Sequence, residues 1–224
     1  MPLFVVGTPI GNLEDLSVRA LRTLREVDAI ACEDTRTTLK LLSHFEIRKP
    51  VIAFFEHSTR RRFEELLDRL RKGDSIALVS EAGTPAVSDP GCTLVAAALE
   101  AGVPVHPIPG PSAVTAAASV SGFPVDRFVF EGFLPRKPGK RRKALRALRE
   151  ESRTLIFYES PHRIVETLED MLAELGDRRI TIARELTKVH EELLRTTLAR
   201  ALDRWRETEP RGEFTLVVES LLTN

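Results

Sequence analysis

Cysteine, tryptophan and tyrosine are scarce in this chain of 224 residues, which has two, one and one of them. Cys32 and Cys92 lie in different segments without the spacing of metal ligands. This argues against a disulfide scaffold or a zinc module and favours a reducing compartment. No apolar run approaches the roughly 20 residues that span a bilayer, and no segment resembles a secretory signal. We expect a cytoplasmic protein without a membrane span or a bound metal ion.

Net charge is also lacking, because Lys plus Arg and Asp plus Glu both number 33. The overall balance therefore indicates neither a nucleic-acid-binding protein nor an acidic surface, and any electrostatic inference has to be local. The hydrophobic fraction of 42% is enough for one large core or two modest ones.

Short apolar runs rich in Val, Ile and Phe recur along the first half of the chain and do not alternate with polar residues. Such runs are typical of strands that are covered on both faces. Segments with helical periodicity separate them, so right-handed crossovers and a mainly parallel sheet are expected. These strands are predicted within residues 3–8, 29–34, 51–56, 75–81 and 104–110.

The composition changes between Val120 and Val125, from small residues to a basic and aromatic segment. We predict an α/β protein of two α/β domains. The first, residues 1–120, has a mainly parallel sheet flanked by helices, and the second, residues 121–224, has a mixed sheet with helices. Strands of the second domain are predicted within residues 127–133, 154–160, 179–185 and 213–219.

The loops that follow the first five strands are rich in Gly, Pro, Ser, Thr and carboxylates, and the fourth reads SEAGTPAVSDPG from Ser80 to Gly91. Ligands of parallel sheets bind outside the carboxyl ends of the strands, where these loops lie. The loops lack the G-x-G-x-x-G and Gly-Lys-Ser/Thr patterns of phosphate binding. Glu81 and Asp89 favour a neutral or cationic ligand instead. Asp89 is expected to cap the next helix, with Pro90 at its first position.

Seven motifs follow one another along the chain: GTPIGNLEDLS, EDTR, SEAGTPAVSDPG, PGPSA, GFLPRK, FYESPHR and ARELTK. In this order they resemble the small-subunit ribosomal RNA ribose 2'-O-methyltransferases of the tetrapyrrole methylase superfamily, from Val6 to about Leu216. The resemblance implies a homodimeric enzyme that binds S-adenosyl-L-methionine in a folded form in a cleft between the two domains. Its implied reaction is methylation of a cytidine ribose in 16S-type rRNA. The resemblance assigns cofactor contacts to Pro9, Ile10, Gly83, Thr84, Val87, Ser112, Ala113, Tyr158, Glu159 and Ala183.

Candidates for the chemistry lie in EDTR. A ribose hydroxyl is a poor nucleophile at neutral pH, so a positioned carboxylate is expected to accept its proton. Glu33 or Asp34 is the preferred acceptor, with Arg36 holding a substrate phosphate; alternatively, Asp34 and Arg36 form only a local ion pair or a helix cap. His57 follows the third strand and is more often a structural histidine than a base. Glu81 replaces the Asp that is usual in the family, which leaves its role open.

The segment from Arg136 to Arg149 holds eight Lys or Arg residues and no acid. A solvated basic helix is the ordinary explanation, but phosphate contacts by such residues supply most sequence-independent RNA affinity. Aromatic residues are sparse there, so base stacking is not evident and docking on a structured particle is preferred. The candidate RNA contacts are Arg60, Arg61, Lys140, Arg141, Arg142, Arg146, His162 and Arg163.

Two other functions compete with the rRNA methyltransferase. A methylase of the same superfamily could act on a tetrapyrrole or another small molecule, although the basic helix and EDTR count against it. A non-enzymatic RNA-binding protein could also retain the fold, and the two differ from each other in whether S-adenosylmethionine binds.

Overall fold

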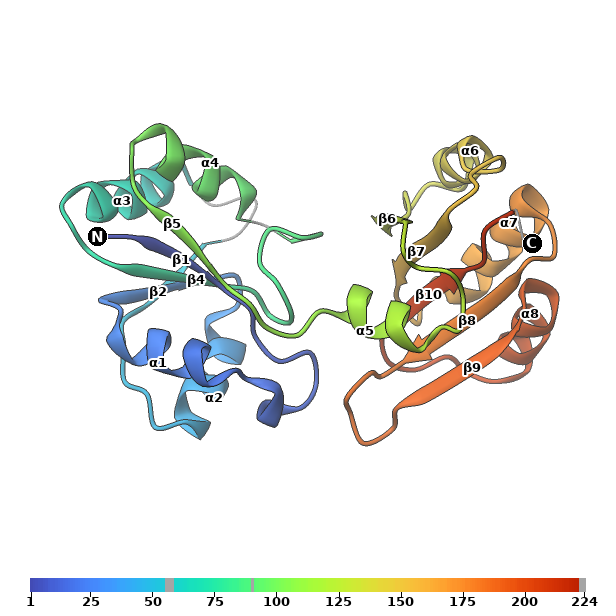
Figure 1. Ribbon diagram of the computed structural model, residues 1–224, viewed down its shortest axis with the longest axis horizontal. Coiled ribbons are helices and arrows are strands. Elements are labelled where there is room, and N and C mark those ends of the chain that lie inside the picture. The colour runs from blue at the N-terminus through green and yellow to red at the C-terminus, as the bar shows by residue number, and fades with distance from the viewer. Residues whose placement is uncertain (55–58, 90, 222–224) are drawn as a thin grey trace. The chain divides into compact units, whose positions relative to one another are not determined.

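The computed structural model describes residues 1–54, 59–89 and 91–221 (Figure 1). The chain divides into two compact units, Met1–Ser112 and Ala113–Asn224. The composition placed the boundary after residue 120. In the structure the boundary comes earlier, after Ser112, because helix α5 (Ala113–Val120) belongs to the second unit. Val114 and Ala117 of this helix are buried against Ile156 and Val217 of the second sheet.

The first unit contains one parallel sheet with the strand order β3-β2-β4-β1-β5. The five strands are β1 (Leu3–Val6), β2 (Ala29–Cys32), β3 (Val51–Ala53), β4 (Ile76–Val79) and β5 (Val105–Ile108). Each lies within a run predicted as a strand. Their carboxyl ends share one edge, so the five loops that the sequence marked out begin there.

Helices cover both faces of this sheet. Helices α1 (Val18–Glu26) and α2 (Thr35–His44) pack on one face, and α3 (Arg60–Arg71) and α4 (Cys92–Glu100) pack on the other (Figure 1). A short 3-10 helix, Leu13–Asp15, precedes α1. Because β2 and β4 are buried at every position, they show no polar alternation.

The second unit contains a mixed sheet with the strand order β6-β7-β10-β8-β9. Its strands are β6 (Phe128–Phe133), β7 (Thr154–Glu159), β8 (Arg179–Arg184), β9 (Glu192–Thr197) and β10 (Phe214–Val218). Strands β6 and β7 are parallel, and the other pairs are antiparallel. The predicted mixed sheet is therefore confirmed. Strand β9 was not predicted, because it is a half-buried edge strand with four polar residues among its six.

Two layers cover the second sheet. One face carries α6 (Pro138–Ala147), α7 (Ile164–Leu175) and α8 (Leu198–Glu207), and the other carries α5 (Figure 1). Phe157, Leu216 and Ile182 point into the first layer, whereas Ile156 and Val217 point toward α5. This alternation decides which face each functional side chain of β7 reaches.

No helix among the described residues has the length and apolar character needed to cross a membrane. Within the same residues, no three His, Cys, Asp or Glu side chains are grouped so that they could hold a metal ion.

Candidate functional site

The first and fourth loops of the parallel sheet are joined by their backbones. The amide of Thr8 donates to the carbonyl of Gly83 at 2.9 Å, and the amide of Gly83 donates back to the Thr8 carbonyl at 3.0 Å. The Thr8 hydroxyl lies 3.4 Å from the carbonyl oxygens of both Ser80 and Gly83. This bridge brings the predicted cofactor positions Pro9 and Ile10 next to Gly83.

The first and fifth loops approach each other more closely than side chains allow. A Cβ atom added to Gly7 would lie 2.8 Å from the Cα and N atoms of Gly110, and one added to Gly110 would lie 2.7 Å from the Gly7 carbonyl oxygen. Glycine at both positions is therefore required by the contact. It fixes the start of the PGPSA loop, which leads to the candidate residues Ser112 and Ala113, beside GTPIG.

The backbone of the fourth loop is unusual. Gly83 and Gly91 have φ angles of +78° and +126°, and the non-glycine residues Ala86 and Ser88 also lie in the left-handed region at +69° and +57°. Such angles cost a non-glycine residue about 1–2 kcal/mol, so the surrounding structure has to impose them. Between them Val87 is 46% exposed, while Thr84 is half-buried.

Asp89 does not cap helix α4, in contrast to the expectation. The helix begins at Cys92 with Gly91 as its N-cap and without a side-chain cap; Pro90 lies outside the described residues. The carboxyl of Asp89 instead takes part in an acidic group with Glu33 and Glu81. Burial raises the pKa of Asp89 above its ordinary value, the charge of Glu81 adds to this, and side-chain hydrogen bonds with Ser80 and Glu33 oppose it.

Asp34 and Arg36 adopt the local arrangement that the sequence left open as an alternative. Asp34 is the N-cap of α2 and accepts from the Arg36 amide at 2.7 Å. The Arg36 guanidinium pairs with the same carboxylate at 2.9 Å, and the arginine side chain is 87% exposed. These hydrogen bonds hold the pKa of Asp34 below its ordinary value. Asp34 is therefore a weak proton acceptor, whereas the exposed Arg36 can still contact a phosphate.

A pocket of about 190 Å³ is lined in part by Glu81 of the acidic group. It lies between the first loop, the fourth loop and the first turns of α2, where its lining residues directly follow the EDTR motif. Its lining includes small hydroxyl side chains, two leucines and two charged residues: Thr8, Pro9, Leu13, Thr37, Thr38, Lys40, Leu41, Ser80 and Glu81. His57, the other candidate from the third loop, lies outside the described residues.

In the second unit, the three predicted cofactor positions divide between the two faces of the sheet. Tyr158 and Ala183 both lie opposite Thr215 in register and belong to the face that α5 covers. Glu159 follows Tyr158 and points to the other face, where its carboxylate accepts from the hydroxyl of Thr167 at 2.5 Å. The structure thus brings Tyr158 and Ala183 together but turns the Glu159 side chain away from them.

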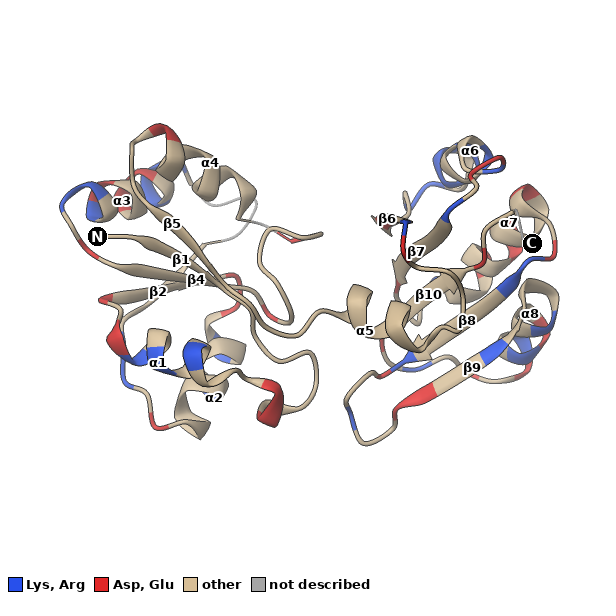
Figure 2. Ribbon diagram, viewed as in Figure 1, with Lys and Arg blue, Asp and Glu red and all other residues tan. Residues whose placement is uncertain are grey.

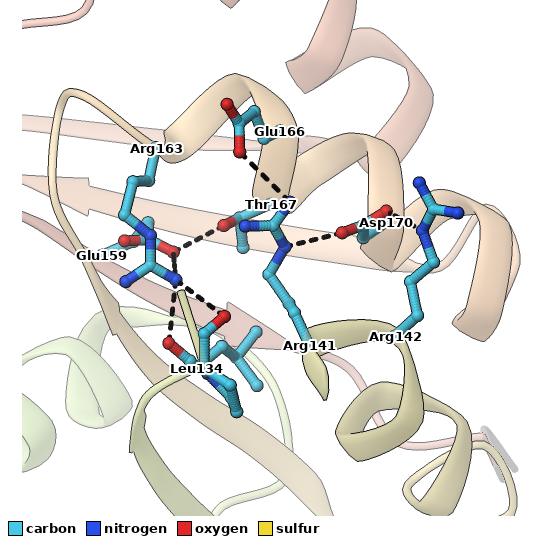
Figure 3. Close-up of polar contacts among 9 residues, drawn as sticks. Leu134, Arg141, Arg142, Glu159, Arg163, Glu166, Thr167 and Asp170 are labelled. Atoms are coloured by element: carbon cyan, nitrogen blue, oxygen red, sulfur yellow. Dashed lines mark hydrogen bonds and ion pairs between the residues drawn. The ribbon is translucent and has the colours of Figure 1, made fainter. Parts of the chain in front are cut away.

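Glu159 and Arg163 instead hold the GFLPRK loop (Figure 3). The Glu159 carboxylate lies 3.6 Å from the Arg163 guanidinium, which donates to the Leu134 carbonyl at 2.8 Å. The same guanidinium nitrogen of Arg163 lies 3.4 Å from the Pro135 carbonyl oxygen. Since the Arg163 side chain is only 18% exposed and its guanidinium already donates to the Leu134 carbonyl beside Glu159, we do not retain it as an RNA contact.

The basic helix α6 is paired with acidic residues of α7 (Figures 2 and 3). Arg141 is 2% exposed and lies 2.6 Å from Asp170, which also binds Arg142 at 2.7 Å. Arg146 binds Glu174 at 2.8 Å. Burial excludes Arg141 from phosphate contact, and the pairing of Arg142 and Arg146 explains much of the basic run structurally.

The remaining basic candidates are exposed. Lys140 lies in the first turn of α6, and His162 precedes α7. Arg60 and Arg61 begin α3, where Arg60 lies 3.9 Å from Glu64. Sequence reasoning named Lys140 but passed over the exposed Arg136 and Lys137, because helical spacing gave them no special place.

With this geometry described, the chain can be compared with known proteins. It matches the family of tetrapyrrole (corrin/porphyrin) methylases over residues 2–202 and belongs to that family. Among its relatives, the ribosomal RNA small subunit methyltransferase I of Thermotoga maritima is 49% identical over 96% of this chain and 97% of the relative. The protein of the same name from Halalkalibacterium halodurans is 52% identical over 97% of this chain and 75% of the relative.

Solved structures support the same fold. A cobalt precorrin-4 methyltransferase of cobalamin biosynthesis matches with a TM-score of 0.74 and 19% identity, over 97% of this chain and 94% of that chain. A diphthine synthase also gives a TM-score of 0.74, with 20% identity over 100% of this chain and 92% of that chain. At these identities the likeness concerns the fold alone, and it confirms the predicted pair of α/β units.

Proposed function

We propose that this protein transfers a methyl group from S-adenosylmethionine to the 2'-hydroxyl of a cytidine in small-subunit rRNA, on the assembled particle in the cytoplasm. Its family uses S-adenosylmethionine as methyl donor. The relatives named as rRNA small subunit methyltransferases match nearly the whole chain at about half identity. The structural observation that carries the proposal is the Thr8–Gly83 bridge, which joins two loops with predicted cofactor contacts.

The residues at this edge suit the cofactor. Joined backbone loops offer amides and carbonyls, and the φ of +78° at Gly83 suits glycine, which adds no side chain beside Ile10. Glu33, Glu81 and Asp89 give the loops a negative character that favours a cationic sulfonium over a phosphate. We infer that Pro9, Ile10, Gly83, Thr84 and Val87 hold the cofactor, and that Ser112, Ala113, Tyr158 and Ala183 also contact it.

S-adenosylmethionine supplies an electrophilic methyl group and a neutral leaving group, so the protein needs no acid at that end. Its main task is to hold the ribose hydroxyl in line. We infer that the Glu33 and Asp89 carboxylates together accept the hydroxyl proton, because two carboxylates in one site retain a proton more readily than isolated ones. Asp34 would then orient Arg36, whose exposed guanidinium binds a substrate phosphate while it stays paired with Asp34.

Calorimetry with S-adenosylmethionine tests the cofactor site. Thr84→Arg should abolish binding without unfolding the protein, because it places a long cation in the fourth loop. Thr93→Arg is the matched control, since Thr93 is exposed on α4. Failure of the parent protein to bind would leave only a non-enzymatic role for the fold.

Methyl transfer to three acceptors tests the substrate: small-subunit particles lacking the modification, protein-free small-subunit rRNA, and a tetrapyrrole. We expect transfer to particles, and a product ribose resistant to alkaline hydrolysis at a cytidine. Transfer to the tetrapyrrole alone would identify a small-molecule methylase instead.

We also propose a homodimer, as the family resemblance implies. Sedimentation of the pure protein should then give about twice the mass of the 25.0 kDa chain. A monomer that is fully active on particles would contradict it.

A further inference from the structure

An aromatic group lies at the end of β6 and β7, on the face of the second sheet that carries α5. The Tyr158 ring contacts two phenylalanine rings. It lies edge-on to Phe130 with ring centroids 4.9 Å apart, and its centroid is 5.5 Å from that of Phe133. Phe130 and Tyr158 are half-buried, but Phe133 is 54% exposed. The outermost ring therefore offers a face to solvent while the two behind it support it.

A β-bulge puts the two phenylalanines on one face. Residues three apart on a regular strand point to opposite faces. Here Phe130 lies opposite Ile156, Gly132 opposite Phe157 and Phe133 opposite Tyr158, so the register shifts by one residue between Phe130 and Gly132. Gly132 has a φ of +62°, which suits glycine. Bulges of this kind re-aim a side chain, often beside a functional site.

Phe133 is exposed because it lies at the edge of the second sheet. Phe133, Tyr158, Thr215, Ala183 and Leu193 lie opposite one another as one row across all five strands. Thr215 and Ala183, inside the row, are 4% and 1% exposed, whereas Phe133 and Leu193 at its two ends are 54% and 47% exposed. Leu193 thus provides an aliphatic counterpart to Phe133 in the same row.

The chain that follows Phe133 is basic and held in place. Arg163 fixes the carbonyl groups of Leu134 and Pro135. The exposed Arg136 and Lys137 come directly after them, and the exposed Lys140 follows in the first turn of α6. An exposed aromatic ring beside several cations is the combination that binds single-stranded nucleic acid, because the cations track phosphates and the ring stacks on a base. A hydrophobic protein partner would instead have to desolvate three charged side chains at the edge of the contact.

We propose that Phe133, supported by Tyr158, is a platform on which a nucleobase of the rRNA substrate stacks, which rests on the function proposed above. Lys137 and Lys140 bind the phosphates next to that base. The structure thereby revises the expectation that base stacking is not evident, since it gathers three rings that the sequence spreads over 29 residues, from position 130 to 158.

The test compares Phe133→Leu and Phe133→Trp with the parent in steady-state methyl transfer to small-subunit particles lacking the modification. Phe133→Leu should raise KM for particles about 5- to 100-fold, the range of one lost base contact, while Phe133→Trp retains or lowers it. The dissociation constant for S-adenosylmethionine, measured by calorimetry, should not change for either variant. The slope of log KM against log salt should also stay the same, because no phosphate contact is lost.

Leu193→Ala is the matched control, and its KM for particles should equal that of the parent. An unchanged KM for Phe133→Leu would overturn the proposal. A loss of cofactor affinity with unchanged KM for particles would place Phe133 against the cofactor instead, and a shift to a smaller mass in sedimentation would place it in a subunit contact. If the parent itself transfers no methyl group to particles, the proposed function fails, and that result is distinct from these.

Discussion

Nε of Arg141 lies 2.6 Å from Oδ2 of Asp170, and both side chains are almost completely shielded from solvent. Asp170 also accepts from Arg142, and Arg141 reaches Glu166 at 3.3 Å. Because these contacts join the first turns of α6 to the middle of α7, they fix the helix that follows the GFLPRK loop. The basic run is therefore first of all a device for packing two helices, and only its outward residues are available to RNA.

We predict that Asp170→Asn destabilises the protein by about 3–5 kcal/mol, because it leaves the buried Arg141 charge with only the exposed Glu166 carboxylate as an acidic partner. Urea unfolding measures the change. Glu169→Gln is the control: Glu169 pairs with Arg206 at 2.6 Å on the surface, and such pairs contribute about 1 kcal/mol or less. Equal effects of the two substitutions would show that the Arg141 pair is not buried in solution.

We predict that Lys140→Ala lowers the salt dependence of particle binding, with the slope of log K against log salt falling by about one, whereas Arg146→Gln leaves the slope unchanged. Lys140 is exposed, while Arg146 is occupied by Glu174 through two hydrogen bonds. Binding titrations at several salt concentrations give both slopes. A loss of slope in Arg146→Gln comparable to that in Lys140→Ala would mean that particles displace Glu174.

Much of the fold could be predicted because buried parallel strands leave a direct trace in sequence. Strand β2 is apolar at all four positions, and helix-period segments lie on either side of it. Strand β9 left no such trace, since its burial alternates and Glu192 and Arg195 interrupt it. The unit boundary was missed for a related reason: α5 resembles the small-residue loop before it, and only packing on Ile156 and Val217 assigns it to the second sheet.

Side-chain direction was the part of the site that sequence could not provide. A motif names Tyr158 and Glu159 together, but adjacent strand residues face opposite sides of a sheet. In the sequence, Arg141 is one cation among several neighbours, and its acidic partner Asp170 lies 29 positions away on another helix. The bulge that re-aims Phe133 is likewise a property of pairing with β7, although Gly132 was a signal that could have indicated it.

We predict that Gly7→Ala destabilises the protein by about 1–3 kcal/mol and lowers S-adenosylmethionine affinity at least about tenfold. The added methyl group would lie 2.8 Å from backbone atoms of Gly110, which cannot rotate away as a side chain would, so the first and fifth loops must separate. Thermal unfolding and calorimetry measure the two effects.

Gly139→Ala serves as the control for that substitution. No atom lies within 4 Å of a Cβ added at Gly139, and the residue is in the first turn of α6. Alanine should therefore be neutral or stabilising there. Unchanged cofactor affinity in Gly7→Ala would separate the Gly7–Gly110 contact from the cofactor site.

Finally, Asp89→Asn should make the protein more stable at pH 7 and slower by about 10²-fold in methyl transfer to particles, the lower range for loss of a general base. Burial raises the pKa of Asp89, so the folded state holds the proton more tightly than the unfolded state does. Stability of the parent therefore falls as pH rises from the ordinary carboxyl value of 3.8 through the raised pKa, and asparagine removes this decline. The stability gain of the variant should accordingly disappear below pH 3.8, where the parent carboxyl is neutral in both states. Urea unfolding across pH, together with single-turnover methyl transfer, measures both effects, and Glu100→Gln, at an exposed position at the end of α4, is the control. A variant that is stabilised at neutral pH but transfers methyl groups at the parental rate would show that the acidic group shapes the loop without receiving the proton.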